Sequence, residues 1–441
     1  MKNYRCLLFT GLLLLSASIL FAQNFAQKEY EYLNKLQQTS GEKLTEYIIA
    51  EYEHFLTAYP FSVSTPDVML RMSEKWQQKG KEYKALASFL KLYYVFPDYA
   101  NANQIRAKIL ALVSSERTLR KMEEKITALL DKRSSATEIA HRYFNYLEAL
   151  SVLTGSNMER LVDETVAEAR FFHSRYPDDV RRDSLTIWIA DIYRRYGEDR
   201  EAASEYLKFD YLYSGSVFLP YARYQRGMLA FEKLKQPEQA IEIFQKVVTE
   251  HNTSKYAGKA QFATGQVYEE KLKNYPAAID AYRLVVSGYD DSENAVAALE
   301  KIAIIQSKRL RAMADAVKTY REILEKYTDH VDSPRLYVIC ADLYLKQLKD
   351  YDQAAVFYAL AAENNPEHED APELWIEAGE TCDHRLNDYR RAIQYYQKVI
   401  ELYPNHKKAR DAQKKINEAE KKIVPETENN SDKENLDGNE K

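Results

Sequence analysis

Three short stretches of the sequence carry residue types that bind metals, transfer protons or hold phosphate. The run EHED at residues 367–370 places carboxylates beside an imidazole, but it lies in a polar connection between helical patterns. His384 and Asp388 are four residues apart, without the second histidine of a His-Glu-x-x-His zinc motif. The run AGKA at residues 257–260 lacks the glycine spacing of a phosphate-binding loop. We therefore expect solvated residues at these positions, with no catalytic, metal or cofactor-binding site and no cofactor.

Cysteine chemistry is a second candidate. Cys6 is the first residue of the N-terminal apolar run and lies too early to carry a lipid. Cys340 and Cys382 fall in the first helices of neighbouring helical units. A disulfide needs Cα atoms within about 7 Å, whereas neighbouring helices lie roughly 8–10 Å apart. We interpret Cys340 and Cys382 as buried thiols that pack as small hydrophobic residues, with pairing as the alternative.

The composition excludes several function classes. Of 441 residues, 45% are hydrophobic and 29% charged, and Gly and Pro number only 12 each, which favours helices. The net charge is −5 with acids and bases mixed along the chain, so nothing resembles a nucleic-acid-binding surface. The carboxylates follow exposed helix faces, and no stretch is left for a separate catalytic domain. These features predict a protein that is not an enzyme and does not bind nucleic acid.

The N-terminal segment, 1–22, has the pattern of a signal peptide. Lys2 and Arg5 precede an apolar run over residues 6–22, which has the length of a signal sequence and is marginal for a membrane span. We predict cleavage after Ala22 and export to a bacterial periplasm, with association with the outer membrane left open. If the segment stays uncleaved, it would be the part of the chain that contacts the membrane.

A sequence repeat with a constant period organises most of the chain. In each repeat an alanine is followed four residues later by Phe or Tyr. The pairs recur with a period of 38 residues, the difference between Ala202 and Ala240. They are Ala202/Tyr206, Ala240/Phe244, Ala278/Tyr282, Ala316/Tyr320, Ala354/Tyr358 and Ala392/Tyr396. A second small residue precedes each of the last five alanines at a constant offset: Gly227, Gly265, Ala303, Ala341 and Gly379. Such a period in helix pairs is typical of a solenoid. Small residues allow close helix crossings, and we expect the aromatic residue to fill the space between successive pairs.

The pattern divides the chain into five parts. After the signal peptide (1–22) comes a polar, helical lead-in (23–43), and then N-terminal repeats (44–160) that include a degenerate helical segment at 101–158. A regular solenoid follows over 161–418. The remaining residues, 419–441, form an acidic tail that is too polar to fold and that we interpret as solubilising, with docking as the alternative.

These residues resemble the tetratricopeptide repeat (TPR). In that family a Gly or Ala with a Tyr three residues later marks the first helix, as in Gly265 and Tyr268, and an Ala, an aromatic and a Pro mark the second, as in Ala354, Tyr358 and Pro366. The family unit has about 34 residues; here one extra residue lies in the turn between helices and three lie between repeats. The repeats also look similar to those of the periplasmic coordinator of the Tol-Pal system and of the TPR lipoprotein of the outer-membrane β-barrel assembly machine.

The resemblance implies an all-α fold, a right-handed α-solenoid of TPR-like helix pairs whose first helices line a concave groove. Carried over by register, the groove positions of the last two units are Arg335, Val338, Asp342, Leu345 and Lys346, then Glu373, Ile376, Glu380, Asp383 and His384. The aromatic-rich helix beginning at Pro220 gives the predicted partner-binding residues, which are Arg194, Arg195, Tyr221, Tyr224, Met228, Phe231 and Phe262. Aromatic residues and Arg dominate binding hot spots, although these aromatics could instead pack between repeats.

The expected function is a non-catalytic scaffold of the cell envelope that binds a protein or peptide partner in the groove. The alternatives are a carbohydrate-binding or uptake-complex accessory subunit, or an envelope enzyme. Neither the partner nor the oligomeric state follows from the sequence.

Overall fold

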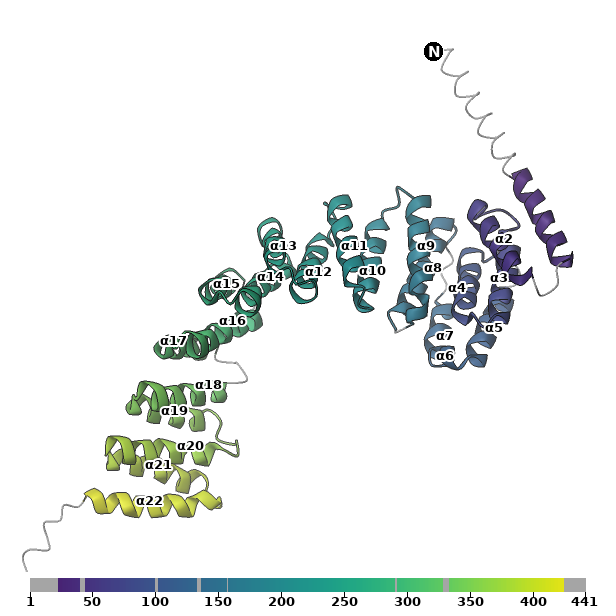
Figure 1. The fold of residues 1–441 in the computed structure, drawn as a ribbon. Coiled ribbons are helices and arrows are strands. Elements are labelled where there is room, and N and C mark those ends of the chain that lie inside the picture. The colour runs from purple at the N-terminus through teal and green to yellow at the C-terminus, as the bar shows by residue number, and fades with distance from the viewer. Residues whose placement is uncertain are drawn as a thin grey trace, which may run out of the picture. The chain divides into compact units, whose positions relative to one another are not determined.

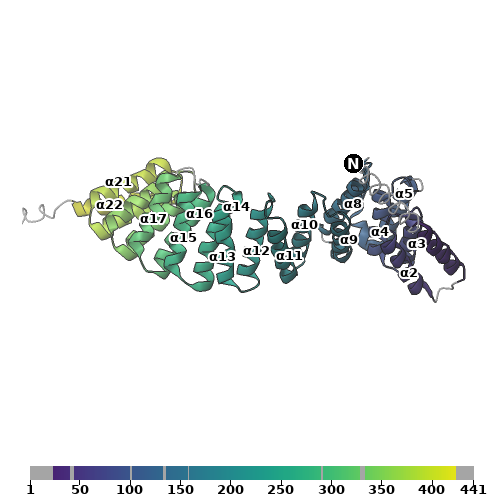
Figure 2. The same ribbon diagram turned by 90° about the horizontal axis from the view of Figure 1, so that it is seen from above.

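The computed structural model describes residues 23–39, 44–99, 102–132, 136–156, 158–289, 292–327 and 333–423. Within these ranges every regular element is helical (Figures 1 and 2). The predicted signal peptide and the tail beyond residue 423 lie outside them. Among the described residues, no helix combines the length and the apolar character needed to cross a membrane.

The chain forms two compact units, residues 1–222 and 223–441, and the division falls inside α12 (Leu219–Glu232). The first unit contains a helix over residues 23–39, then α2 (Thr45–Ala58), α3 (Thr65–Gln78), α4 (Glu82–Val95), α5 (Ala102–Ser115), α6 (Arg117–Arg120), α7 (Glu123–Asp131), α8 (Ile139–Thr154), η2 (Glu159–Leu161), α9 (Val162–Arg175), α10 (Arg182–Arg195) and α11 (Asp199–Leu212). The second unit contains α13 (Pro237–Glu250), α14 (Lys255–Gln266), η3 (Val267–Leu272), α15 (Tyr275–Gly288), α16 (Ser292–Ile304), η4 (Ile305–Arg309), α17 (Met313–Lys326), α18 (Ser333–Asp342), η5 (Leu343–Leu348), α19 (Tyr351–Glu363), α20 (Ala371–Thr381), η6 (Cys382–Leu386), α21 (Tyr389–Leu402) and α22 (Lys407–Ile423).

Helix pairs of the second unit stack in chain order, and each second helix contacts the first helix of the next pair (Figure 1). Second helices from α11 to α21 begin at a constant interval, at Asp199, Pro237, Tyr275, Met313, Tyr351 and Tyr389. The alanine at the fourth position of each helix is fully buried. The helix pairs therefore form a solenoid, in which each pair packs on the next.

The close crossing of two helices is seen where a glycine faces an aromatic ring. A Cβ added at Gly265 would lie 2.5 Å from Cε1 of Tyr282, and one added at Gly227 would lie 2.5 Å from Cε1 of Phe244. Both contacts are within one helix pair. The expectation that the aromatic residue fills the space between successive pairs therefore needs correction, because the ring lies directly over the small residue of its own pair.

The turn between the two helices of a pair contains a residue with left-handed backbone geometry. Gly80 and Gly197 occupy this position in the first unit, with φ of 66° and 80°. In five later pairs the position is held by Lys235, Lys273, Arg311, Lys349 and Asn387, with φ between 53° and 59°. Four of these later turns follow a π-helical turn, η3 to η6, which ends the first helix.

The first unit departs from the regular stack at α5–α7. α4 contacts both α5 and α8, so α8 packs on α4 although α5, α6 and α7 lie between them in the chain. The apolar residues that predicted helix over 101–158 are buried in the core of this unit, including Ile109, Leu112, Leu119 and Ile126.

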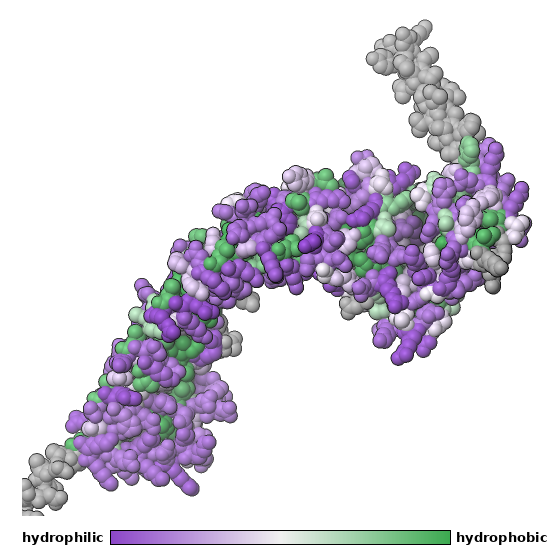
Figure 3. Space-filling view, in the orientation of Figure 1, coloured by the Kyte–Doolittle hydropathy of each residue, from purple (hydrophilic) through white to green (hydrophobic). Residues whose placement is uncertain are grey.

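The last helix, α22, packs on α21 and closes the second unit. It continues to Ile423, and Ala419 is fully buried, so helix extends into the first residues of the predicted acidic tail. Its solvent-facing side is hydrophilic, as Figure 3 shows, which is typical of a terminal capping helix.

Candidate functional site

A groove of about 780 Å³ lies between α18 and α20 in the second unit. Its apolar walls come from Val338 and Ile339 of α18, Leu345 of η5 and Leu374 of α20. Around them are charged residues from the same elements and from the connection between α19 and α20: Arg335, Asp342, Lys346, His368, Asp370, Glu373 and Glu377. The volume of this groove lies within the range of ligand-binding sites, and its apolar walls are surrounded by charged side chains.

Most charges of the groove have partners within the protein. Asp342 accepts a hydrogen bond from the Tyr358 hydroxyl at 2.6 Å and forms an ion pair with Lys346 at 2.9 Å. Arg335 is 2.6 Å from a carboxylate oxygen of Glu300. Glu373 forms an ion pair with Lys408 of α22. The cations that line the groove are therefore already engaged.

The exception among the acids is Glu377, which is half-buried in the groove. Its carboxylate makes no hydrogen bond or ion pair with any described residue. Burial raises the pKa of Glu377, and the neighbouring carboxylates of Glu380 and Glu373 raise it further. A cation placed beside this carboxylate would relieve both the desolvation and the like-charge repulsion.

Five of the register-derived groove positions line this cavity, Arg335, Val338, Asp342, Leu345 and Lys346, together with Glu373 of the next helix. The other four register-derived positions, Ile376, Glu380, Asp383 and His384, do not line it. Ile376 is 2% exposed and belongs to the core, and Asp383 is 4% exposed and paired with Lys422 at 2.6 Å.

The seven predicted partner-binding residues are distributed over both units. In the first, the Tyr221 hydroxyl donates to Oδ1 of Asp191 at 2.6 Å, and Nε of Arg194 is 3.8 Å from the same oxygen. Burial and the hydrogen bond to Asp191 raise the pKa of Tyr221. Arg195 donates to the Gly155 carbonyl.

In the second unit, the other four predicted residues make contacts typical of packing groups. Phe231 is 4% exposed, and the half-buried Tyr224 and Met228 pack on the same cluster. The Tyr224 ring lies 6.0 Å from that of Phe244, and the Phe262 ring lies 5.2 Å from that of Tyr282. The partner-binding role of the seven residues remains a prediction.

The described part of the chain contains neither a metal-binding cluster nor a disulfide at the candidate positions. Cys340 and Cys382 are unpaired and fully buried, and burial raises the pKa of the Cys340 thiol to about 12. A thiol of this kind is unreactive near neutral pH. Within the same residues, no cluster of three or more His, Cys, Asp or Glu side chains could hold a metal ion.

Comparison with known families identifies the repeat type. Two sequence profiles of the tetratricopeptide repeat match, one over residues 221–254 and one over residues 372–406. The chain contains tetratricopeptide repeats. The second matched TPR covers α20, η6 and α21, so the α20 wall of the groove belongs to a TPR.

Several solved TPR structures are similar to parts of the chain. A TPR protein from Parabacteroides merdae is 17% identical, with 62% of this chain and 98% of that one covered, at a TM-score of 0.33. The C-terminal part of a TPR protein from Cytophaga hutchinsonii is 16% identical, with 61% and 98% covered, at a TM-score of 0.39. At these values the similarities indicate nothing about function. No curated protein matches the chain significantly.

Glu377, Leu374 and Tyr358 are groove residues that register reasoning did not single out, because they lie outside the five carried-over TPR positions. The spacing of the acidic residues in α20 could have indicated the like-charge environment of Glu377. Glu373, Glu377 and Glu380 are spaced four and three residues apart, which places like charges together on one helix face.

Proposed function

We propose that this chain is a non-catalytic protein-interaction scaffold of the bacterial cell envelope. In this proposal, the groove between α18 and α20 binds an extended partner segment that carries a lysine or arginine among aliphatic residues. The observation that carries it is the unpartnered, half-buried Glu377 between the apolar walls of the groove.

The chemistry of the partner follows from the groove. Aliphatic side chains would cover Val338, Leu345 and Leu374, and burial of apolar surface contributes about 25 cal/mol per Å². A lysine or arginine beside Glu377 adds a charge-assisted hydrogen bond, typically about 1.5–3 kcal/mol. Because the groove is built from packed helices, binding would cost little ordering of the protein itself.

Photocrosslinking in intact cells tests the groove. A photoreactive residue in place of Val338 should form an adduct with a partner protein, whereas one at Arg390, an exposed residue of α21 that does not line the groove, should not. Glu377→Gln should reduce the Val338 adduct about tenfold, the equivalent of about 1.4 kcal/mol. Equal adducts from the two positions, or an adduct indifferent to Glu377→Gln, would refute the assignment.

The envelope location is supported by the charged residues Lys2 and Arg5, by the apolar run over residues 6–22, and by the resemblance of the repeats to those of the two envelope proteins named above. Cell fractionation with mass spectrometry of the N-terminus tests it. We expect a periplasmic chain that begins at Gln23. A cytoplasmic chain that retains residues 1–22 would contradict this location.

Incubation of the protein with peptidoglycan and soluble glycans separates the scaffold from its alternatives. The scaffold predicts neither turnover nor saturable glycan binding. Saturable glycan binding would favour an accessory subunit for carbohydrate uptake, and turnover would favour an enzyme.

A further inference from the structure

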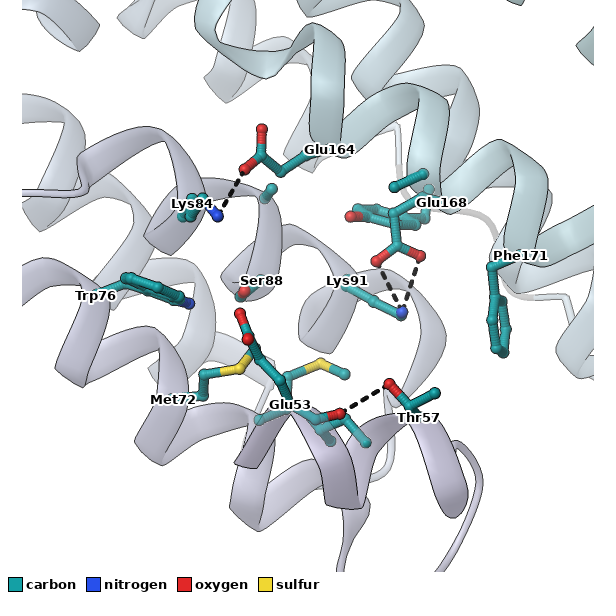
Figure 4. Close-up of a pocket in the computed structure, with 15 residues that line it drawn as sticks. Glu53, Thr57, Met72, Trp76, Lys84, Ser88, Lys91, Glu164, Glu168 and Phe171 are labelled. Carbon is teal, nitrogen blue, oxygen red and sulfur yellow. Dashed lines mark hydrogen bonds and ion pairs between the residues drawn. The ribbon is translucent and has the colours of Figure 1, made fainter. Parts of the chain in front are cut away.

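A second pocket, of about 440 Å³, lies wholly within the first unit (Figure 4). Three of its five contributing helices, α2, α4 and α9, are second helices by the repeat pattern, so it is not part of a first-helix groove. Its apolar lining comes mainly from Leu56, Met69, Met72, Trp76 and Phe171. The flexible side chains of Met69 and Met72 can adapt to apolar groups of different shapes.

Two ion pairs connect α4 with α9 along the pocket. Nζ of Lys91 is 2.8 Å from Glu168, and Nζ of Lys84 is 3.6 Å from Glu164. The ammonium of Lys91 also lies 5.2 Å from the centre of the Phe171 ring. Both lining lysines are thus neutralised by glutamates of α9, as the dashed lines in Figure 4 show.

Several polar groups of the pocket make no side-chain hydrogen bond or ion pair with any described residue. Three of them are the carboxylate of Glu53, the hydroxyl of Ser88 and the indole N–H of Trp76. In Figure 4 the Glu53 carboxylate points into the pocket on the side of Ser88, and the nitrogen edge of Trp76 faces the same space. One free anionic acceptor and two free donors therefore converge on an apolar lining.

We propose that this pocket is a second peptide-binding site, specific for an extended segment in which a lysine or arginine adjoins an aliphatic residue. The aliphatic side chain covers Met72 and Phe171. The cation pairs with Glu53, the lining charge that lacks a partner. Backbone carbonyls of the segment accept hydrogen bonds from Ser88 and Trp76. The pocket does not depend on the groove between α18 and α20.

Tryptophan indole NMR reports on the pocket directly. The full chain labelled with ¹⁵N-indole tryptophan gives signals from Trp76, Trp188 and Trp375, of which Trp76 alone lines this pocket. The probe is an octapeptide with Leu-Lys-Leu at its centre and Gly-Ser flanks, compared with the same peptide carrying Leu-Glu-Leu. We expect a saturable shift of the Trp76 signal with Leu-Lys-Leu and at least fivefold weaker binding of Leu-Glu-Leu.

Substitutions locate the effect. Glu53→Gln should weaken Leu-Lys-Leu binding about fivefold, as expected for an exposed ion pair, and Glu51→Gln on the same helix, outside the pocket, should not. Ser88→Val should weaken it at least tenfold by filling the pocket. Glu377→Gln should leave the Trp76 shift unchanged, which separates this site from the groove. No saturable Trp76 shift, equal binding of both peptides, or an unchanged affinity in Glu53→Gln would overturn the proposal.

Discussion

Replacement of Gly265 by alanine should destabilise the second unit, although alanine is the better helix former. Gly265 lies in α14, and a Cβ there would be 2.5 Å from Cε1 and 2.6 Å from Cδ1 of Tyr282. Ordinary carbon–carbon contacts are about 3.5–4.0 Å. The Tyr282 ring is fully buried in α15, so it cannot move into solvent to avoid the new methyl group.

The magnitude follows from three competing effects. Overpacking of a core typically costs about 1–3 kcal/mol. A displaced Tyr282 ring would also strain the hydrogen bond from its hydroxyl to Glu269, which is 2.9 Å long and belongs to a class that contributes about 1.5–3 kcal/mol. The higher helix propensity of alanine returns about 1 kcal/mol. Because the two costs exceed the gain, we expect a net loss of about 2–4 kcal/mol.

Urea unfolding followed by circular dichroism measures the loss, and hydrogen exchange of the α14 and α15 amides locates it, since repeat proteins can unfold in parts. Gly288→Ala is the matched control, because a Cβ at Gly288, the last residue of α15, meets nothing within 4 Å. It should be neutral or stabilising by up to about 1 kcal/mol. If Gly265→Ala proves as stable as Gly288→Ala, the close approach to Tyr282 is not a real constraint.

Three further substitutions test the turns and one half-buried histidine. Ala312 precedes α17 without a side-chain cap, where Asp350 caps α19, so Ala312→Asp should raise the free energy of unfolding by about 1 kcal/mol in urea titrations. Gly197 has a φ of 80°, so Gly197→Ala should lower the free energy of unfolding by about 1–2 kcal/mol in the same assay. A stabilising effect would contradict the left-handed turn. Burial lowers the pKa of His173. As the pH falls below about 6.5, the unfolded chain therefore takes up a proton before the folded chain does, and the free energy of unfolding falls by at most about 1.4 kcal/mol per pH unit. Urea midpoints measured between pH 7.5 and 5 should fall less steeply in His173→Gln than in the unsubstituted protein.

The sequence predicted the helix pairs because small and aromatic residues recur in register. Prolines lie in the first turn of several helices, where an N–H has no helical partner: Pro334 and Pro372 are the second residues of α18 and α20, and Pro237 is the first of α13. The course of α5–α7 could not be read in the same way. Their apolar periodicity indicates helix, but periodicity alone does not show that α8 would pack on α4.

The candidate groove was predictable only in part. Register correctly placed Val338, Asp342 and Leu345 on its wall, because they repeat the first-helix positions of the family. It also placed Ile376 there, which is in the core. Which charges lack partners could not be predicted, because the partner of Arg335 is Glu300, in the preceding repeat. An unpaired Glu377 is therefore a property of the tertiary structure.

The spacing between the two small residues of a pair explains which residue stands in each turn. α3/α4 and α10/α11 have the shorter spacing, from Ser73 to Ala85 and from Ala190 to Ala202, and glycine takes the left-handed position. There the bond that closes the turn spans five residues, as from Glu198 N–H to the Tyr193 carbonyl at 3.0 Å.

In the pairs whose spacing is longer by one, such as Gly265 to Ala278, the closing bond spans six, as from Asn274 N–H to the Tyr268 carbonyl at 3.0 Å. In four of these pairs the extra residue is thus taken up in the π-helical end of the first helix. The left-handed residue is then most often Lys or Arg, such as Lys273. Left-handed geometry costs such a residue about 1–2 kcal/mol, and a cation at a helix C-terminus recovers about 0.3–1 kcal/mol. The long turns can therefore dispense with glycine at a small net cost, which is consistent with their repetition along the second unit.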